Sequence, residues 1–216
     1  MIMRRFCLLP CLLSLMLLPT LVEAQAAKGD SSQTKEATVE HGEITNGIYK
    51  NPTFGFSYRV PYGWVDRTDE IWEASTDPAK SIVLLAVFER PPLATGSSVN
   101  SSVVIAAESV ASYPGLKSAA QYFGPLSEVT QAKGLQPVNE PYEFPVDGKP
   151  VVRRDFSKKI SQVAMYQSTL AMLLKGYVLS FTFIGSGDEE VQRLIEWLRI
   201  GNPARPAKNS SKSSKP

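Results

Sequence analysis

Apolar residues stand at every second position from Phe54 to Val60, with polar or small residues between them. This alternation is typical of a β-strand that buries one face. Pro61 follows directly and cannot donate a hydrogen bond to a neighbouring strand, and Gly63 permits a turn. The pattern therefore predicts a strand that ends before Pro61, followed by a turn that returns Trp64 to the core.

Two further segments, 81–89 and 103–107, are apolar at both odd and even positions. Strands of this kind are covered on both faces, so we expect them at central positions of a sheet. Asp147-Gly148 predicts a tight hairpin between strands, and Lys175-Gly176 predicts a second one.

Two segments have helical patterns. Residues 117–133 favour a helix that Gly124-Pro125 should split or kink. Ser186 and Glu189 fit a capping box at the start of a closing helix. Its core-facing stripe follows helical spacing and consists of Val191, Leu194, Ile195 and Leu198. Together the elements predict an α+β fold, a meandering antiparallel sheet with helices packed on its faces.

Several short motifs resemble the PsbP-like fold family, which is named for an extrinsic subunit of photosystem II. They are Tyr49-x-Asn51, Gly55-Phe56-Ser57, Pro61-x-x-Trp64, Gly148 before Arg153-x-Asp155, and Lys175-Gly176-Tyr177 before Phe181-x-Phe183. The resemblance implies an α/β/α sandwich in a single domain over residues 47–201, and a role as an assembly or accessory factor. The resemblance identifies no functional residue in this chain. It also does not imply a PsbP-type metal site, because residues 47–201 contain no histidine.

Residues 1–24 have the pattern of a signal peptide, with two arginines before an apolar run and small residues near the end. We expect cleavage between Ala24 and Gln25, with cleavage after Ala26 as the alternative. The apolar run is shorter than the roughly 20 residues that a membrane span needs. The sequence therefore predicts an exported protein, periplasmic or extracellular, without a transmembrane span.

Both cysteines of the chain, Cys7 and Cys11, belong to this segment. The mature chain is therefore expected to lack disulfides, thiol nucleophiles and thiolate metal ligands. A lipid anchor on Cys11 is disfavoured, because Pro10 stands where a lipidation signal has a small residue.

Residues 25–46 contain almost no large apolar side chain, which predicts a flexible leader. Residues 202–216 predict a disordered tail rich in Ser, Lys and Pro. The formal net charge of the chain is +2, and the basic residues of this acid-free tail account for it. We expect the domain itself to be mildly acidic and to be a monomer. Nucleic acid is excluded as a partner, because binding would need positive charge clustered on the domain.

The candidate catalytic residues are few. His41 is the single histidine and lies in the predicted leader, which argues against histidine-based triads and zinc sites. Carboxylates occur near the predicted strands at Glu89, Glu108, Glu140, Glu143 and Asp155. Their spacing singles out no acid–base pair. The sequence thus predicts no enzyme, metal or cofactor, and a small-molecule or ion-binding enzyme that uses carboxylates alone is the alternative.

Three residues are candidate contacts for a protein partner. Trp72 lies among acidic residues and could be a half-exposed contact anchor or a lid over the sheet edge. Arg153 and Arg154 belong to the one dense basic cluster of the domain, but alternation sends them to opposite faces and Asp155 is a natural partner of Arg153. We therefore predict a non-enzymatic accessory or binding protein that acts through protein or envelope contacts outside the cytoplasm.

Overall fold

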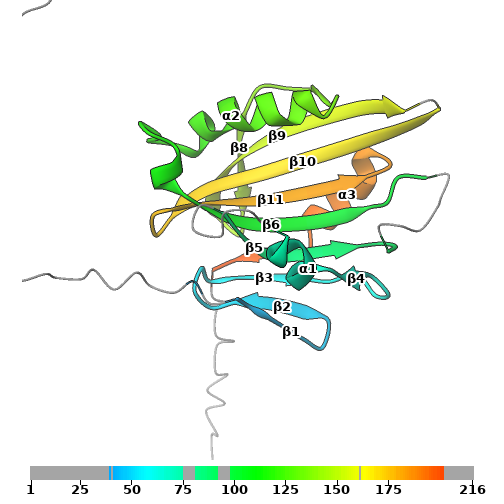
Figure 1. Cartoon of the computed structure of the whole chain (residues 1–216), viewed down its shortest axis with the longest axis horizontal. Helices are drawn as coiled ribbons and strands as arrows, with labels where there is room; N and C mark the ends of the chain where they lie inside the picture. The colour runs from blue at the N-terminus through cyan, green and yellow to red at the C-terminus, as the bar shows by residue number, and fades with distance from the viewer. Residues whose placement is uncertain (1–38, 40, 75–80, 92–97, 161, 202–216) are drawn as a thin grey trace, which may run out of the picture. The chain divides into compact units, whose positions relative to one another are not determined.

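Two antiparallel sheets form the framework of the chain (Figure 1). The computed structural model describes residues 39, 41–74, 81–91, 98–160 and 162–201. The predicted signal peptide with its Ala24–Gln25 cleavage site, most of the predicted leader and the segment 202–216 lie outside these residues.

The larger sheet has the strand order β4-β5-β6-β11-β10-β9-β7, and β8 also pairs with β9. Its strands are β4 Val65–Asp66, β5 Ser81–Phe88, β6 Ser102–Ser109, β7 Gln136–Pro137, β8 Tyr142–Val146, β9 Lys149–Ile160, β10 Val163–Leu174 and β11 Tyr177–Gly185. All its pairs are antiparallel. The predicted fold class is thus confirmed, and both doubly apolar segments lie inside the sheet as β5 and β6.

The smaller sheet has the order β1-β2-β3-β12. Its strands are β1 Glu43–Thr45, β2 Ile48–Asn51, β3 Phe56–Arg59 and β12 Leu198–Ile200. The predicted alternation is confirmed, because Phe54, Phe56 and Tyr58 are buried. Phe56 meets Phe181 of β11 edge to face, with ring centroids 5.2 Å apart. The alternating face of β3 therefore packs the smaller sheet against the larger one.

The helices cover opposite faces of the larger sheet. They are α1 Thr68–Glu73, α2 Ala119–Ala132 and α3 Asp188–Ile195, and a 3₁₀ turn follows β6 at Val110–Ser112. α2 packs through Tyr122 and Phe123 with Ala171 of β10. The neighbouring residue Leu170 points the other way, into the core that α3 and the smaller sheet share. The larger sheet is therefore the middle layer of a sandwich.

Three hairpins have positive φ at both turn residues, which is the backbone of a type I′ turn. Two of them, at Asp147-Gly148 and Lys175-Gly176, confirm the predicted turns. The third, Asn46-Gly47, joins β1 to β2. The prediction that residues up to Asn46 form a flexible leader is wrong at this end, because residues 43–45 pair with β2.

α2 is one continuous helix with Pro125 inside it, so Gly124-Pro125 does not split the helix, and the kink that was the other form of the prediction stays a prediction. Interactions at both ends hold it together. The side chain of Gln121 accepts hydrogen bonds from the backbone of Lys117 at 2.7 Å and of Ser118 at 3.2 Å. Gly134 follows with φ of +85°, and the next amide bonds back into the last turn.

The cap of α3 differs from its predicted form. The carboxylate of Glu190, rather than that of Glu189, accepts from the amide of Ser186 at 2.8 Å and its hydroxyl at 2.6 Å. Ser101 donates a third hydrogen bond at 2.6 Å. Burial alone would raise the pKa of Glu190, but these hydrogen bonds outweigh it and lower the pKa. The helix begins after Gly187, one residue later than the predicted box implies, and it ends at Ile195, so the placement of Leu198 on its helical stripe is wrong because Leu198 begins β12.

Candidate functional site

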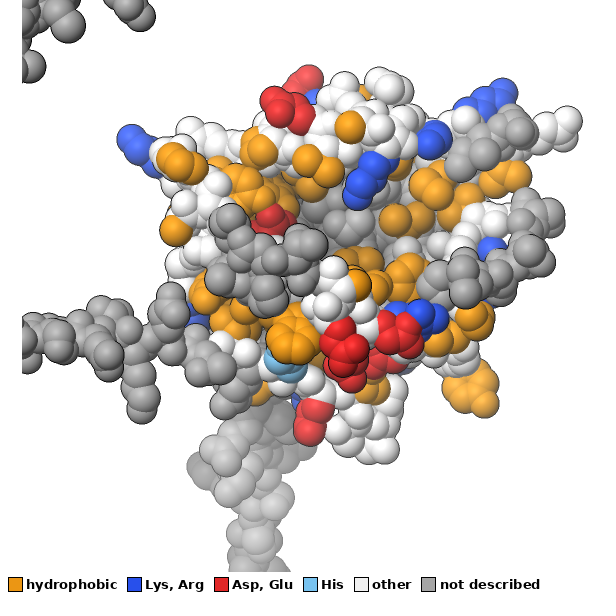
Figure 2. Space-filling model, in the orientation of Figure 1, with side chains coloured by type: hydrophobic (Ala, Val, Ile, Leu, Met, Phe, Trp, Pro, Cys, Tyr) orange, Lys and Arg blue, Asp and Glu red, His pale blue; other side chains and the backbone are white. Residues whose placement is uncertain are grey.

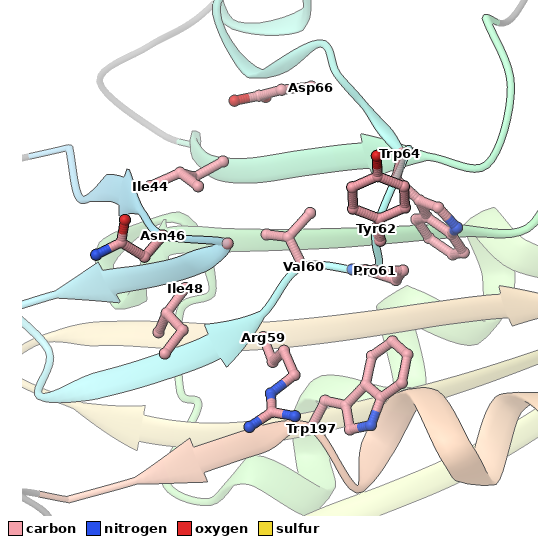
Figure 3. Close-up of a pocket in the computed structure, with 12 residues that line it drawn as sticks. Ile44, Asn46, Ile48, Arg59, Val60, Pro61, Tyr62, Trp64, Asp66 and Trp197 are labelled. Atoms are coloured by element: carbon pink, nitrogen blue, oxygen red, sulfur yellow. The ribbon is translucent and has the colours of Figure 1, made fainter.

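A groove of about 660 Å³ opens beside the smaller sheet (Figure 3). The β1–β2 turn forms one wall, the end of β3 and the turn after it form another, and Trp197 closes it from the segment between α3 and β12. Its apolar lining consists chiefly of Ile44, Ile48, Val60, Tyr62, Trp64 and Trp197. We call this feature the aromatic groove.

Tyr62 stands fully exposed at the lip of the aromatic groove. The turn that carries it is closed by a hydrogen bond from the amide of Trp64 to the carbonyl of Pro61, 3.3 Å long. Gly63 has φ of +80°, which a type II turn requires at its third residue. Because Pro61 and Gly63 fix the backbone on both sides, the Tyr62 ring is held in solvent by a defined turn.

Trp64 and Trp197 form the floor of the aromatic groove. Both are partly buried and pack on the core cluster that the two sheets share. The interpretation of Trp64 as a core residue holds only in part, because one side of its ring reaches the groove. Sequence reasoning did not single out Trp197 or Tyr62, since a short-range pattern carries no signal that these turns converge.

Trp72 of α1 is 37% exposed, as a half-exposed contact would be. Its ring meets that of His41 edge to face, with centroids 5.4 Å apart. His41, expected to be mobile, thus packs against the domain just before β1. Since Ile44 of β1 lines the aromatic groove, β1 connects the groove to the Trp72 surface.

Exposed acidic side chains lie on β1, β4 and α1, and Asp66 of β4 also lines the aromatic groove. We call them the acidic border, and they are Glu43, Asp66, Asp69, Glu70 and Glu73. Figure 2 shows acidic side chains gathered next to the histidine and to apolar surface. Lys50 of β2 stands opposite Glu43, Arg67 pairs with Glu70 and Arg59 lies in the groove, so five acidic residues outnumber three basic ones.

The structure separates the two arginines of the basic cluster as predicted. Arg153 faces α3, is 5% exposed, and donates to Asp155 at 2.7 Å, which confirms that pairing. Arg154 faces α2 and donates to Ser127 at 2.7 Å and to the carbonyl of Asn139 at 3.1 Å. A partner contact by either arginine stays a prediction. Both guanidinium groups are occupied by hydrogen bonds within the domain.

Two of the carboxylates near the strands, Glu108 and Asp155, are held by hydroxyl, amide and guanidinium donors. Glu108 accepts from the phenols of Tyr122, at 2.5 Å, and of Tyr113. Burial foremost, and then Glu108 itself, raises the pKa of both phenols, so they remain donors. Asp155 is bound by Arg153 and other donors. This arrangement fixes structure and leaves neither carboxylate poised as a free base.

Two absences hold for the described residues. They contain no group of three or more His, Cys, Asp or Glu side chains placed to hold a metal ion. Within the same part of the chain, no helix is both long enough and apolar enough to cross a membrane.

Comparison with known proteins finds no matching family model and no matching curated protein. Solved structures do match. Cyanobacterial PsbP from Synechocystis sp. PCC 6803 is 13% identical, with 74% of this chain and 97% of that chain covered, at a TM-score of 0.47. LpqN of Mycobacterium tuberculosis, described as involved in cell envelope biogenesis, is 13% identical, with 68% and 83% covered, at 0.39. PA94 of Pseudomonas aeruginosa, described as of unknown function, is 14% identical, with 50% and 72% covered, at 0.35. Among these similar structures, cyanobacterial PsbP represents the fold family that the sequence motifs resemble.

Proposed function

We propose that this protein is an exported, non-enzymatic accessory protein that binds a segment of a partner protein in the aromatic groove. The observation that carries the proposal is the fully exposed ring of Tyr62 at a groove that two partly buried tryptophans also line. Large aromatic side chains at a concave surface are the residues that most often dominate binding energy in protein interfaces. Trp72 extends the same surface across β1.

The negative charge of the acidic border favours a partner segment that carries positive charge. A segment that inserts an apolar side chain between Tyr62 and Trp197 passes beside exposed carboxylates, among them Asp66 at the groove itself. Complementary charge raises the association rate and rejects like-charged partners. We therefore assign the groove to an extended segment in which large apolar residues are flanked by Lys or Arg.

The alternative, an enzyme that uses carboxylates alone, needs two carboxylates that converge on a cleft. The aromatic groove contains one, Asp66, whose side chain accepts from the amide of Thr68 at 2.9 Å and from its hydroxyl at 2.6 Å. The carboxylate of Asp66 is therefore bonded to the first residue of α1. The geometry of the aromatic groove therefore supports binding more than catalysis.

The proposal is tested with two synthetic peptides that share a central Phe-Leu pair, one flanked by lysines and the other by glutamates. The basic peptide should bind and the acidic peptide should not, and raising the salt from about 0.05 to 0.3 M should weaken binding several-fold because the attraction is screened. Tyr62→Ala and Trp72→Ala should each weaken binding about tenfold, the size expected for an anchor residue. Isothermal titration calorimetry of the purified chain measures these affinities.

Tyr142→Ala is the matched control, because Tyr142 is an exposed tyrosine outside the aromatic groove. Its affinity for the basic peptide should equal that of the unmodified chain. Equal binding of both peptides, or an unchanged affinity after Tyr62→Ala, would contradict the assignment of the groove.

Export is the second part of the proposal and is supported by the pattern of residues 1–24. We expect the chain purified from outside the cytoplasm to begin at Gln25, or at Ala27 if cleavage follows Ala26. Intact-mass spectrometry distinguishes these products. An unprocessed Met1 on the exported chain, or a lipid on Cys11, would contradict this prediction.

A further inference from the structure

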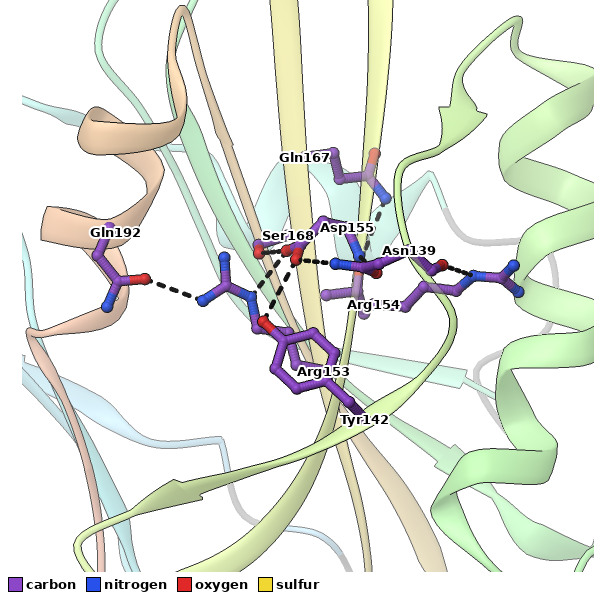
Figure 4. A network of polar contacts seen from close by, with 9 residues as sticks. Asn139, Tyr142, Arg153, Arg154, Asp155, Gln167, Ser168 and Gln192 are labelled. Atoms are coloured by element: carbon purple, nitrogen blue, oxygen red, sulfur yellow. Dashed lines mark hydrogen bonds and ion pairs between the residues drawn. The ribbon is translucent and has the colours of Figure 1, made fainter.

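A second pocket, of about 530 Å³, lies between β9, β10, the loop before β8 and the start of α3. Polar side chains dominate its wall. They are chiefly Asn139, Arg153, Asp155, Ser168, Asp188 and Gln192, with Tyr142 and Tyr166 as aromatic members. We call it the polar pocket, and Figure 4 shows the contacts that hold its wall in place.

The carboxylate of Asp155 organises this wall. It accepts from Arg153 Nε at 2.7 Å, from Asn139 Nδ2 at 2.6 Å, from the phenol of Tyr142 at 3.4 Å and from the hydroxyl of Ser168. The amide of Asp155 in turn donates to Asn139 Oδ1 at 3.0 Å. Four side chains from three parts of the chain are thereby fixed around one acid.

Arg153 carries the network across to α3. Its Nη1 donates to Oε1 of Gln192 at 2.9 Å, so this glutamine presents the nitrogen end of its amide as a donor. The guanidinium also lies 5.1 Å from the ring centre of Phe144 and 6.0 Å from that of Tyr142. Because hydrogen bonds and rings fix the guanidinium from several sides, the pocket is ordered before any ligand arrives.

The charges of the polar pocket disfavour an anion. Arg153 is neutralised by its ion pair with Asp155, and the exposed carboxylate of Asp188 lies at the start of α3. An anion would therefore meet the carboxylate of Asp188 without a free positive charge in the wall to balance it. Solvent screens the attraction of this exposed carboxylate for a cation, whereas a neutral ligand can form hydrogen bonds along the polar wall.

We propose that the polar pocket binds a neutral saccharide. Sugar hydroxyls donate and accept, which matches the wall groups that lie outside the Asp155 network, namely the amide nitrogen of Gln192, the carboxylate of Asp188 and the phenol of Tyr166. The ring of Tyr142, 40% exposed, offers an apolar surface against which the C–H groups of a sugar ring can pack. The volume is also within the range of small-molecule sites, about 300–1,000 Å³. This site is separate from the aromatic groove and does not depend on the function proposed for it.

The test is an NMR titration of the isotope-labelled full chain with glucose, galactose, N-acetylglucosamine, maltose and cellobiose. Glucose 6-phosphate and spermidine serve as the anionic and cationic comparators. We expect at least one neutral sugar to shift the amide resonances of residues around Tyr142 and Gln192, with neither ionic comparator binding more tightly. Tyr142→Ala should weaken that sugar about tenfold, whereas Tyr142→Phe, which keeps the ring, should retain most of the affinity.

Tyr62→Ala is the matched control, since it removes an exposed tyrosine from the other groove, and it should leave sugar affinity unchanged. Circular dichroism establishes that each variant is folded. The proposal is overturned if none of the five sugars shifts these resonances, if a comparator binds there more tightly than every sugar, or if Tyr142→Ala binds the sugar as well as the unmodified chain does.

Discussion

Replacement of Arg153 by alanine is expected to lower the free energy of unfolding by about 3–5 kcal/mol, which is the usual cost of removing one partner from a buried ion pair. The side chain is 6% exposed, and its loss leaves the carboxylate of Asp155 without its ion-pair partner and Oε1 of Gln192 without the guanidinium donor. It also opens the space between Phe144 and the network. Urea denaturation followed by circular dichroism measures the change.

Lys159→Ala is the control on the same strand, because Lys159 is a basic residue with an exposed side chain. It should change stability by less than about 0.5 kcal/mol, as surface substitutions do. If Arg153→Ala costs no more than Lys159→Ala, the guanidinium does not hold β9 to α3, and the ordered wall described for the polar pocket is wrong.

Phe181→Ala should be as damaging, with a loss of about 3–5 kcal/mol for a fully buried aromatic residue. The ring is fully buried in β11 and meets Phe56 of the other sheet edge to face. The substitution leaves a cavity where the two sheets touch, which the surrounding strands can fill only in part. Chemical denaturation should show the midpoint falling sharply, or the chain failing to fold.

If Phe181→Ala does not fold, a double-mutant cycle with Phe56→Leu and Phe181→Leu still measures the interaction energy between the two rings. Leucine preserves much of the volume, so each single variant should remain folded. We expect a coupling of about 0.5–1.5 kcal/mol, the range found for aromatic pairs in contact. Additive effects would show that the two rings do not stabilise each other.

Local patterns predicted most of the strands, because successive side chains point to opposite faces of a strand and their polarity shows which face is buried. The alternation at Phe54–Val60 and the doubly apolar stretch at 81–89 both reflect which faces are covered. Asn46-Gly47 carried the same turn signal as Asp147-Gly148 and was missed, since its polar surroundings gave the impression of a flexible leader. That the strands divide into two sheets depends on contacts between distant residues, and periodicity does not contain them.

The candidate sites were predictable only where partners lie close in sequence. Arg153 and Asp155 are two residues apart on one strand face, so their pairing followed from alternation. Asn139, Ser168 and Gln192 join the same network from a loop, another strand and a helix. The aromatic groove has the same origin, because Tyr62 and Trp197 line one groove only after β12 has paired with β3.

Formation of the aromatic groove requires β12, the last strand of the domain, to pair with β3. Residues 198–200 lie beside residues 56–58, so the smaller sheet gains its last strand from the far end of the domain. Until that strand arrives, one edge of β3 presents open backbone groups that can recruit other chains. Trp197 precedes β12 directly and its carbonyl accepts from the amide of Arg59 at 3.2 Å. A chain that stops short of β12 therefore exposes an unpaired strand edge and leaves Trp197 without this hydrogen bond, so the aromatic groove forms only once the whole domain has been made.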